Sequence, residues 1–285
     1  MEWYVILLIV FGAAALALLA LWLFLIAPRA RKKEIAPFLR PYAHRGLWGG
    51  DLPENSLGAF RAAAEAGFAI ELDIQLSRDN EVMVFHDYTL DRVCTRPGKV
   101  CEFSAAELGK MPLSGVESEC IPTLREVLDA IGGRVPLLIE LKGENGNVAL
   151  VPAALKVLEG YSGLWCMESF NPLLLRAVKK HAPHVLRGLL STNLLKEKKS
   201  GSKLLNFALS AHLFNLLCRP AFLAFDKKHP RRIGLRAGLR LFGATPFVYT
   251  VKSEEEYHAY LKAGVCPIFD HFCPQTKGNG TRNEQ

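Results

Sequence analysis

Short apolar runs alternate with helix-like stretches from residue 42 to residue 270, and this alternation limits the fold more than any other feature of the sequence. The amphipathic segments between these runs are Leu57–Ala66, Leu124–Ile131, Val148–Leu158, Pro172–His181 and Glu254–Ala263. Strands that alternate with helices form a parallel sheet, and about eight repeats favour a closed (β/α)8 barrel. The 285 residues leave room for one such domain of about 250 residues and an appendage.

Nine runs are candidates for the barrel strands, one more than the fold uses. They are Tyr42–His44, Ala69–Gln75, Val82–His86, Pro136–Leu141, Leu164–Glu168, Val185–Leu190, Phe222–Phe225, Phe247–Val251 and Pro267–Asp270. Only a Ser-Arg-Asp-Asn turn separates the second run from the third, which leaves no space for a crossover helix. We therefore expect one of the candidates to depart from the regular pattern.

The predicted barrel covers residues 41–272, with one insertion and a short tail. Residues 88–121 have weak periodicity and contain Cys94, Cys101 and Cys120, which is typical of an excursion from the barrel. Residues 273–285 form a polar tail after the last candidate strand.

The first forty residues contain an apolar segment that is long enough to span a membrane. From Trp3 to Ala27 the chain has roughly 25 residues without a charge, which suits a tilted transmembrane helix. Pro28 stops this helix, and a basic juxtamembrane segment follows at once. We predict that residues 1–40 anchor the chain. A cleaved signal peptide is the alternative, but it would need a basic start and a shorter apolar core.

The charges around this segment predict a single-pass protein whose folded domain lies in the cytoplasm. Only Glu2 and the terminal amine precede the apolar segment, whereas Arg29, Arg31, Lys32 and Lys33 follow it. Basic flanks stay on the cytoplasmic side. The seven cysteines are scattered, without a C-x-x-C pair, and free thiols fit a reducing compartment.

Positive charge is concentrated in a later block of the chain. Residues 179–240 carry fourteen basic and two acidic side chains, although the net charge of the whole chain is +7. No nucleic-acid-binding motif is present, and an anchor upstream makes anionic lipid the simpler partner.

The part from 196 to 232 contains the apolar stretch Leu204–Leu217. This part is either a buried helix and strand with solvated flanks, or a surface on the catalytic rim that dips into the membrane. The sequence leaves the oligomeric state open.

Titratable side chains gather near the predicted carboxyl ends of the first four candidate strands, where parallel barrels have their active sites. They are His44, Arg45, Glu71, Asp73, His86, Glu140 and Lys142. Each of these residues also has a purely structural interpretation. A histidine at a strand end often has only a structural role, and carboxylates on an exposed strand are usually just solvated. The neighbours of Glu71 and Asp73 argue against the latter, because Ile70, Leu72 and Ile74 make the opposite strand face apolar. Buried carboxylates must be paired or hold a cation, and oxygen ligands suit Mg²⁺ or Ca²⁺ better than zinc.

These residues belong to motifs that resemble the glycerophosphodiester phosphodiesterase family, over residues 41 to about 272. The motifs are Ala43-His44-Arg45-Gly46, Pro53-Glu54-Asn55-Ser56 with Ala59-Phe60, Glu71-Leu72-Asp73-Ile74, Val84-Phe85-His86-Asp87 with Leu90 and Arg92, Glu140-Leu141-Lys142, and Ser169-Phe170. The resemblance implies a phosphodiesterase TIM barrel that hydrolyses glycerophosphodiesters to glycerol 3-phosphate and an alcohol.

The resemblance also implies a role for each residue of the set. Glu71, Asp73 and Glu140 match the family's ligands for a divalent metal ion. His44 and His86 match its catalytic histidines, and Arg45 and Lys142 match its phosphate-contacting residues. Two imidazoles that titrate near pH 6.5 suit acid and base catalysis at neutral pH. We further expect Phe170 to line the substrate pocket or the core, and Ser56 to cap the first barrel helix. Glu54 lies close enough to the rim to contact the residues that hold the metal ion.

Two alternatives to this function remain open. A lysophospholipase D would use the same site on a lysophospholipid at the membrane, and a non-catalytic barrel would only bind phosphate or lipid. The sequence departs from the family near its end, where Tyr249-Thr250-Val251-Lys252 replaces the usual Trp-Thr-Val-Asn. The usual Asp-Gly-Ile-x-Thr-Asp pattern is also replaced, by Cys266-Pro267-Ile268-Phe269-Asp270. We expect both replacements to affect the shape of the pocket and the substrate preference.

Overall fold

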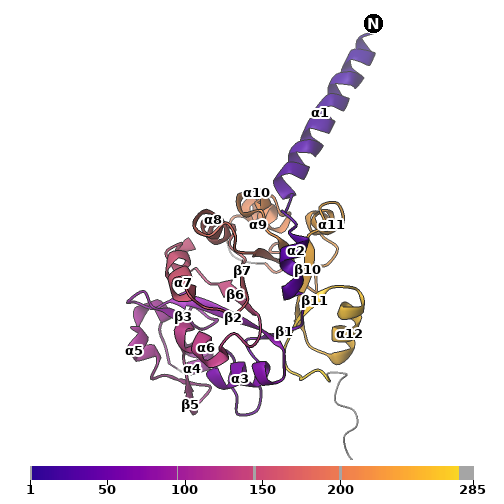
Figure 1. Cartoon of the computed structure of the whole chain (residues 1–285). Helices are drawn as coiled ribbons and strands as arrows, with labels where there is room; N and C mark the ends of the chain where they lie inside the picture. The colour runs from indigo at the N-terminus through magenta and orange to yellow at the C-terminus, as the bar shows by residue number, and fades with distance from the viewer. Residues whose placement is uncertain (1, 95, 144–145, 199–200, 276–285) are drawn as a thin grey trace, which may run out of the picture.

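The computed structural model describes residues 2–94, 96–143, 146–198 and 201–275, and its barrel is built from parallel strands (Figure 1). The eight barrel strands are β1 (Tyr42–His44), β2 (Ala69–Leu76), β6 (Leu137–Leu141), β7 (Trp165–Ser169), β8 (Arg187–Ser191), β9 (Phe222–Asp226), β10 (Thr245–Val251) and β11 (Cys266–Phe269). Each strand pairs with its neighbour in chain order, and β1 closes the ring by pairing with both β2 and β11. The predicted (β/α)8 barrel is confirmed.

The surplus strand candidate is β3 (Val82–Val84), which lies outside the ring. It runs antiparallel to β2, with Leu76 opposite Val82 and Ile74 opposite Val84. Asn80 closes the turn between them with a φ of 63°, a conformation that asparagine tolerates better than most residues. Because an antiparallel partner needs no crossover helix, the short connection that looked irregular in the sequence is a hairpin.

Helices surround the barrel on the outside. They are α3 (Leu57–Glu65), α6 (Leu124–Ile131), α7 (Leu150–Leu158), α8 (Pro172–His181), α9 (Lys203–Ser210), α10 (Asn215–Cys218), α11 (Ile233–Arg240) and α12 (Glu254–Lys262). Ser56 caps α3 by accepting a hydrogen bond from the amide of Ala59, as expected. The stretch Leu204–Leu217 is not one buried helix, because α9 ends at Ser210 and α10 begins at Asn215.

Apolar side chains fill the end of the barrel where the strands begin. Tyr42, Phe222 and Phe247 are fully buried there, and the rings of Phe222 and Phe247 lie 4.6 Å apart. Gly188 makes space for Phe222, because a Cβ at that position would lie 1.9 Å from its ring. The short helices α2 (Lys32–Ile35) and η1 (Ala36–Phe38) add Ile35 and Phe38 to this cluster. This packing leaves the opposite end of the barrel for polar side chains.

The region predicted as an insertion, 88–121, contains short elements of its own. They are α4 (Asp91–Cys94), η2 (Val100–Glu102), α5 (Ala105–Leu108), β4 (Pro112–Leu113) and β5 (Val116–Cys120). A separate apolar cluster that includes Phe85, Leu90 and Leu113 holds them against β3. Most of the predicted polar tail, 273–285, lies outside the described residues.

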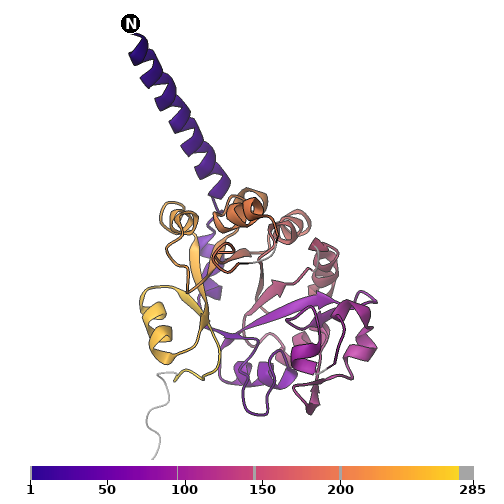
Figure 2. The same ribbon diagram turned by 180° about the vertical axis from the view of Figure 1, so that it is seen from behind.

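Helix α1 (Trp3–Ile26) projects away from the barrel and is long and apolar enough to cross a membrane. In both views it leaves the molecule where α8, α9, α10 and α11 lie (Figures 1 and 2). Its last turn is held by two side chains: Asn215 Nδ2 donates to the carbonyl of Ile26 at 2.6 Å, and Arg219 Nη1 donates to that of Ala27 at 2.8 Å. Ile26 is fully buried in this junction. Helix α1 is thus attached to the barrel at a specific place.

Candidate active site

Three carboxylates lie together inside the barrel near the ends of adjacent strands. Asp73 on β2 is opposite Glu140 on β6, and Glu71 lies two residues before Asp73 on the same face. One oxygen from each carboxylate can be chosen so that all lie within 4.8 Å of one another. All three residues are buried. A fourth carboxylate, Glu168 on β7, is opposite Glu140 in the strand register and is also buried.

Negative charge exceeds positive charge in this cluster. Burial and the nearby Asp73 and Glu140 raise the pKa of Glu71 well above its ordinary value. Burial raises the pKa of Glu140 to about 7, although Lys142 opposes the change. Burial and Glu140 likewise raise the pKa of Glu168. Such a donor set, rich in oxygen and short of positive charge, fits a hard divalent cation.

Two basic side chains compensate part of this charge. Lys142 Nζ lies 2.8 Å from Glu140 Oε1 and 3.2 Å from Asp73 Oδ1. Arg45 Nε lies 3.4 Å from Asp73 Oδ2. Burial opposes the ionisation of Asp73, but Lys142, His86 and Arg45 together lower its pKa below the ordinary value. Asp73 is therefore the most acidic carboxylate of the cluster.

Each histidine is tied to a carboxylate through Nδ1. His44 Nδ1 lies 3.0 Å from Asp270 Oδ2, while its Nε2 lies 3.9 Å from Glu71 Oε2. His86 Nδ1 bonds to Asp87 in the same way. Burial lowers the pKa of both histidines, although Asp270 and Asp87 oppose that effect. The aspartates hold Nδ1 of each ring and leave Nε2 available for proton exchange.

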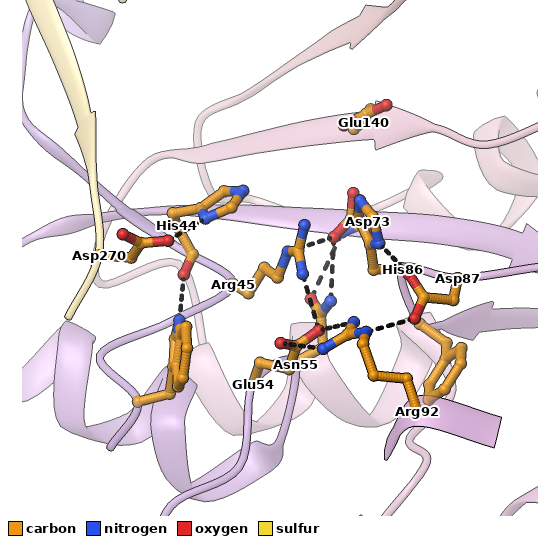
Figure 3. A network of polar contacts seen from close by, with 12 residues as sticks. His44, Arg45, Glu54, Asn55, Asp73, His86, Asp87, Arg92, Glu140 and Asp270 are labelled. Carbon is orange, nitrogen blue, oxygen red and sulfur yellow. Dashed lines mark hydrogen bonds and ion pairs between the residues drawn. The ribbon is translucent and has the colours of Figure 1, made fainter. Parts of the chain in front are cut away.

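A network of ion pairs fixes the loop after β1 (Figure 3). Arg45 Nη1 donates to Glu54 Oε1 at 2.8 Å, and Arg92 binds both oxygens of Glu54 at 2.6 and 2.9 Å. Arg92 Nε also bonds to Asp87, so that Arg92 links the Arg45 side of the rim to the His86 side. Asn55 Nδ2 donates to Asp73 Oδ2 at 3.0 Å. Glu54 thus connects Arg45 to Arg92 at the rim.

The backbone of this loop is shaped to bring Arg45 over the carboxylates. Arg45 has a φ of 60°, and its amide donates to Glu71 Oε2 at 3.1 Å. A left-handed conformation at a residue other than glycine is unfavourable and tends to occur at functional sites. Gly46 follows with a φ of 85°, and a Cβ there would lie 2.8 Å from the backbone of Ala59. Only glycine therefore fits at this position.

A cavity of about 320 Å³ opens beside the carboxylates. His86, Glu140, Lys142 and Phe170 are among its lining residues. Phe170 is 41% exposed and packs edge-on against Tyr249, with ring centroids 5.9 Å apart. Phe170 therefore lines the pocket and is not a core residue.

The structure brings every predicted site residue to the same end of the barrel. The residues are His44, Arg45, Glu71, Asp73, His86, Glu140, Lys142 and Phe170. Sequence reasoning missed Asp270, Glu168, Asp87 and Arg92 as partners. Asp270 and Glu168 are the last residues of two candidate strands. Glu140 was placed in the site because it lies near the carboxyl end of a strand, and the same argument could have found these two residues. Nothing in the sequence pattern indicates the contacts of Arg92.

Comparison with known proteins connects this geometry to a family. The profile described as "Glycerophosphoryl diester phosphodiesterase family" matches residues 44–273. The chain belongs to this family. The predicted family and the prediction of a phosphoric diester hydrolase are confirmed.

Curated relatives support the assignment along most of the chain. A glycerophosphodiester phosphodiesterase from Caldanaerobacter subterraneus subsp. tengcongensis is 32% identical over 237 residues, which cover 78% of this chain and 90% of the relative. A glycerophosphodiester phosphodiesterase from Bacillus subtilis is 26% identical and covers 81% of this chain and 82% of its own length.

Solved structures share the fold. A phosphodiesterase from Oleispira antarctica, in complex with the product sn-glycerol-3-phosphate, has a TM-score of 0.66 and 24% identity. The match covers 81% of this chain and 92% of that one. A glycerophosphodiester phosphodiesterase from Thermotoga maritima has a TM-score of 0.61 and 24% identity over 80% and 92% of the two chains. At these identities the likeness shows the barrel fold.

Proposed function

We propose that this protein is a membrane-anchored, metal-dependent enzyme that hydrolyses glycerophosphodiesters to glycerol 3-phosphate and an alcohol. The observation that carries the proposal is the buried group of Glu71, Asp73 and Glu140 between two histidines that each have an aspartate partner. Family membership supports the reaction class, and the product named for the Oleispira antarctica structure supports the product.

The three carboxylates would hold one divalent cation, Mg²⁺ or Ca²⁺. When bound, the cation neutralises phosphoryl charge, which otherwise repels a nucleophile. Arg45 and Lys142 add positive charge beside the same carboxylates, so they would contact the phosphoryl oxygens of the substrate. Phe170 would contact the organic part of the substrate at the mouth of the cavity.

The two histidines would move the protons of the reaction. One neutral imidazole takes the proton of the attacking hydroxyl, which comes from water or from the glycerol of the substrate. The other imidazole, in its protonated form, gives a proton to the alkoxide as the bond between phosphorus and the leaving oxygen breaks. Asp270 and Asp87 hold Nδ1 of each ring, so that Nε2 does the exchange.

Release of glycerol 3-phosphate from glycerophosphocholine tests this function directly. The full chain in nanodiscs should turn over the substrate with Mg²⁺ or Ca²⁺, and EDTA should abolish the reaction. His44→Ala and Glu71→Gln should each reduce kcat at least about a hundredfold. Turnover that survives EDTA or His44→Ala would contradict the proposal, and absence of turnover with every metal tried would favour a non-catalytic barrel.

We further propose that α1 spans the membrane once, with the barrel on the cytoplasmic side. The basic segment 29–33 after the helix supports this orientation. The basic block 196–232 would add contact with anionic lipid, since Lys196, Lys198 and Lys203 are exposed. A carboxyl-terminal phosphatase fusion should stay inactive if the barrel is cytoplasmic. Activity in anionic nanodiscs should fall with salt, and less so when these lysines are changed to glutamine.

A further inference from the structure

An apolar cavity of about 500 Å³ lies next to the catalytic cavity. Its walls include Leu173, Leu190, Leu205, Leu209, Phe214 and Leu217. Phe170 and Asn171 line both cavities, so the two meet at the end of β7. The volume is within the range of about 300–1,000 Å³ that is typical of small-molecule sites. A glycerophosphodiester has no apolar group to fill it.

Helix α9 forms one wall of this cavity. Its polar side is buried and its apolar side is exposed, which is the reverse of a surface helix in a water-soluble protein. Its polar residues Asn206 and Ser210 are buried, and Ser210 Oγ accepts a hydrogen bond from the amide of Leu194 at 3.0 Å. Its apolar residues Leu204 and Phe207 are 77% and 53% exposed. Helices on aqueous surfaces bury the apolar side and expose the polar side. An exposed apolar face of this kind is typical of contact with a lipid surface.

The position of the anchor points to the same surface. Helix α1 leaves the barrel beside α9 and α10 (Figures 1 and 2). Asn215 on α10 and Arg219 just after it hold the last turn of α1, and Leu217 between them lines the apolar cavity. A bilayer around α1 would therefore lie on the side of the barrel where the cavity is walled by α9.

We propose that this cavity binds the single acyl chain of a lysophospholipid that enters from the membrane. The inference rests on the proposed function, because the phosphodiester of the lipid would lie at the Glu71, Asp73 and Glu140 site. In the reaction the oxygen of water bonds to phosphorus, and the bond from phosphorus to the head-group oxygen breaks. The head-group alcohol leaves with a proton, and the monoacyl glycerol phosphate remains. The substrate class is thus a lipid with one chain and a phosphodiester head group.

Choline release in nanodiscs without choline lipids tests the inference, with the full chain and the activating cation. The substrates are glycerophosphocholine and lysophosphatidylcholines with hexanoyl and octanoyl chains. We expect kcat/KM to rise with chain length, up to about fourfold for each methylene, which corresponds to about 0.8 kcal/mol. Leu209→Trp fills the cavity and should reduce kcat/KM for octanoyl lysophosphatidylcholine at least about tenfold, with glycerophosphocholine unaffected.

Two further variants keep the experiment decisive. Leu205→Trp changes a half-exposed wall residue and should act like Leu209→Trp, even if the latter does not fold. Leu204→Trp lies on the same helix but does not line the cavity, so it should leave both substrates unaffected. Turnover of glycerophosphocholine without any gain from an acyl chain would overturn this inference alone. Failure to turn over either substrate would instead overturn the proposed function.

Discussion

The Nδ1 atom of His44 lies 3.0 Å from Oδ2 of Asp270, which connects the ends of β1 and β11 across the closure of the barrel. A carboxylate at Nδ1 holds the proton on that nitrogen and leaves Nε2 without one. Nε2 is the nitrogen nearest Glu71. Asp270 is therefore a positioning residue for His44.

Asp270→Asn should reduce kcat by about 10²–10⁴-fold with little change in KM, because an amide can turn its NH₂ group toward Nδ1 and stabilise the wrong tautomer. Steady-state kinetics with glycerophosphocholine measure the effect. Asp129→Asn, which removes an exposed carboxylate on α6, should leave kcat unchanged. An Asp270→Asn enzyme within twofold of the parent would mean that His44 does not need this partner.

Arg92→Lys should reduce kcat by about 10–100-fold, although the positive charge is kept. Arg92 bonds to both oxygens of Glu54 and to Asp87, and a lysine cannot reproduce this geometry. The change would loosen Arg45 and His86 together, so KM should rise as kcat falls. Arg61→Lys on α3 is the matched control. Equal kinetics for the two variants would show that the Arg92 contacts are dispensable.

A divalent cation should stabilise the fold, whatever its effect on turnover. Binding to the native state alone adds about 2.7 kcal/mol at a concentration of 100 times Kd, which raises Tm by roughly 5–10 °C in a protein of this size. Titration of Mg²⁺ and Ca²⁺ into the EDTA-treated full chain measures the shift. Glu71→Gln should remove it, whereas Glu65→Gln, an exposed carboxylate on α3, should not. A shift that persists in Glu71→Gln would place the cation elsewhere.

His212 should make the fold sensitive to mild acid. This ring is fully buried, and burial together with Arg232 lowers its pKa to about 3. The unfolded chain, with an ordinary pKa near 6.5, binds a proton more readily, so stability is full above pH 6.5 and falls as the pH decreases toward 3. The loss at pH 5 should be about 2 kcal/mol, or roughly 4–8 °C in Tm.

The comparison with His212→Asn isolates this contribution. Asparagine does not titrate and tolerates the φ of 62° at this position. The variant should be less stable than the parent at pH 7.5, and its Tm should decrease less between pH 7.5 and pH 5. Parallel decreases in the two proteins would rule out His212 as the cause of the acid sensitivity.

The sequence by itself determined the barrel, the family and the candidate site. The spacing of apolar residues along a strand or a helix is a local property of the sequence. The alternating runs therefore predicted the β/α repeat without knowledge of any tertiary contact. His44, Glu71, Asp73 and Glu140 were found because side chains at strand ends share one edge of a parallel barrel. The place of β3 was not determined, since its residues suit a barrel strand and only its antiparallel pairing with β2 excludes it.

Tertiary structure decided which residues support the site and how the barrel contacts helix α1. Asp270 reaches His44 only because β11 closes the ring against β1, a contact between residues 226 positions apart in the chain. Arg92 lies on the short helix α4 and reaches Glu54 in the loop after β1, a contact between residues 38 positions apart in the chain. The sequence did not decide the orientation of α9, in which Asn206 and Ser210 are buried while Leu204 and Phe207 are exposed. A periodic pattern shows that a helix has two faces, but the direction in which each face points depends on what the rest of the chain packs against it.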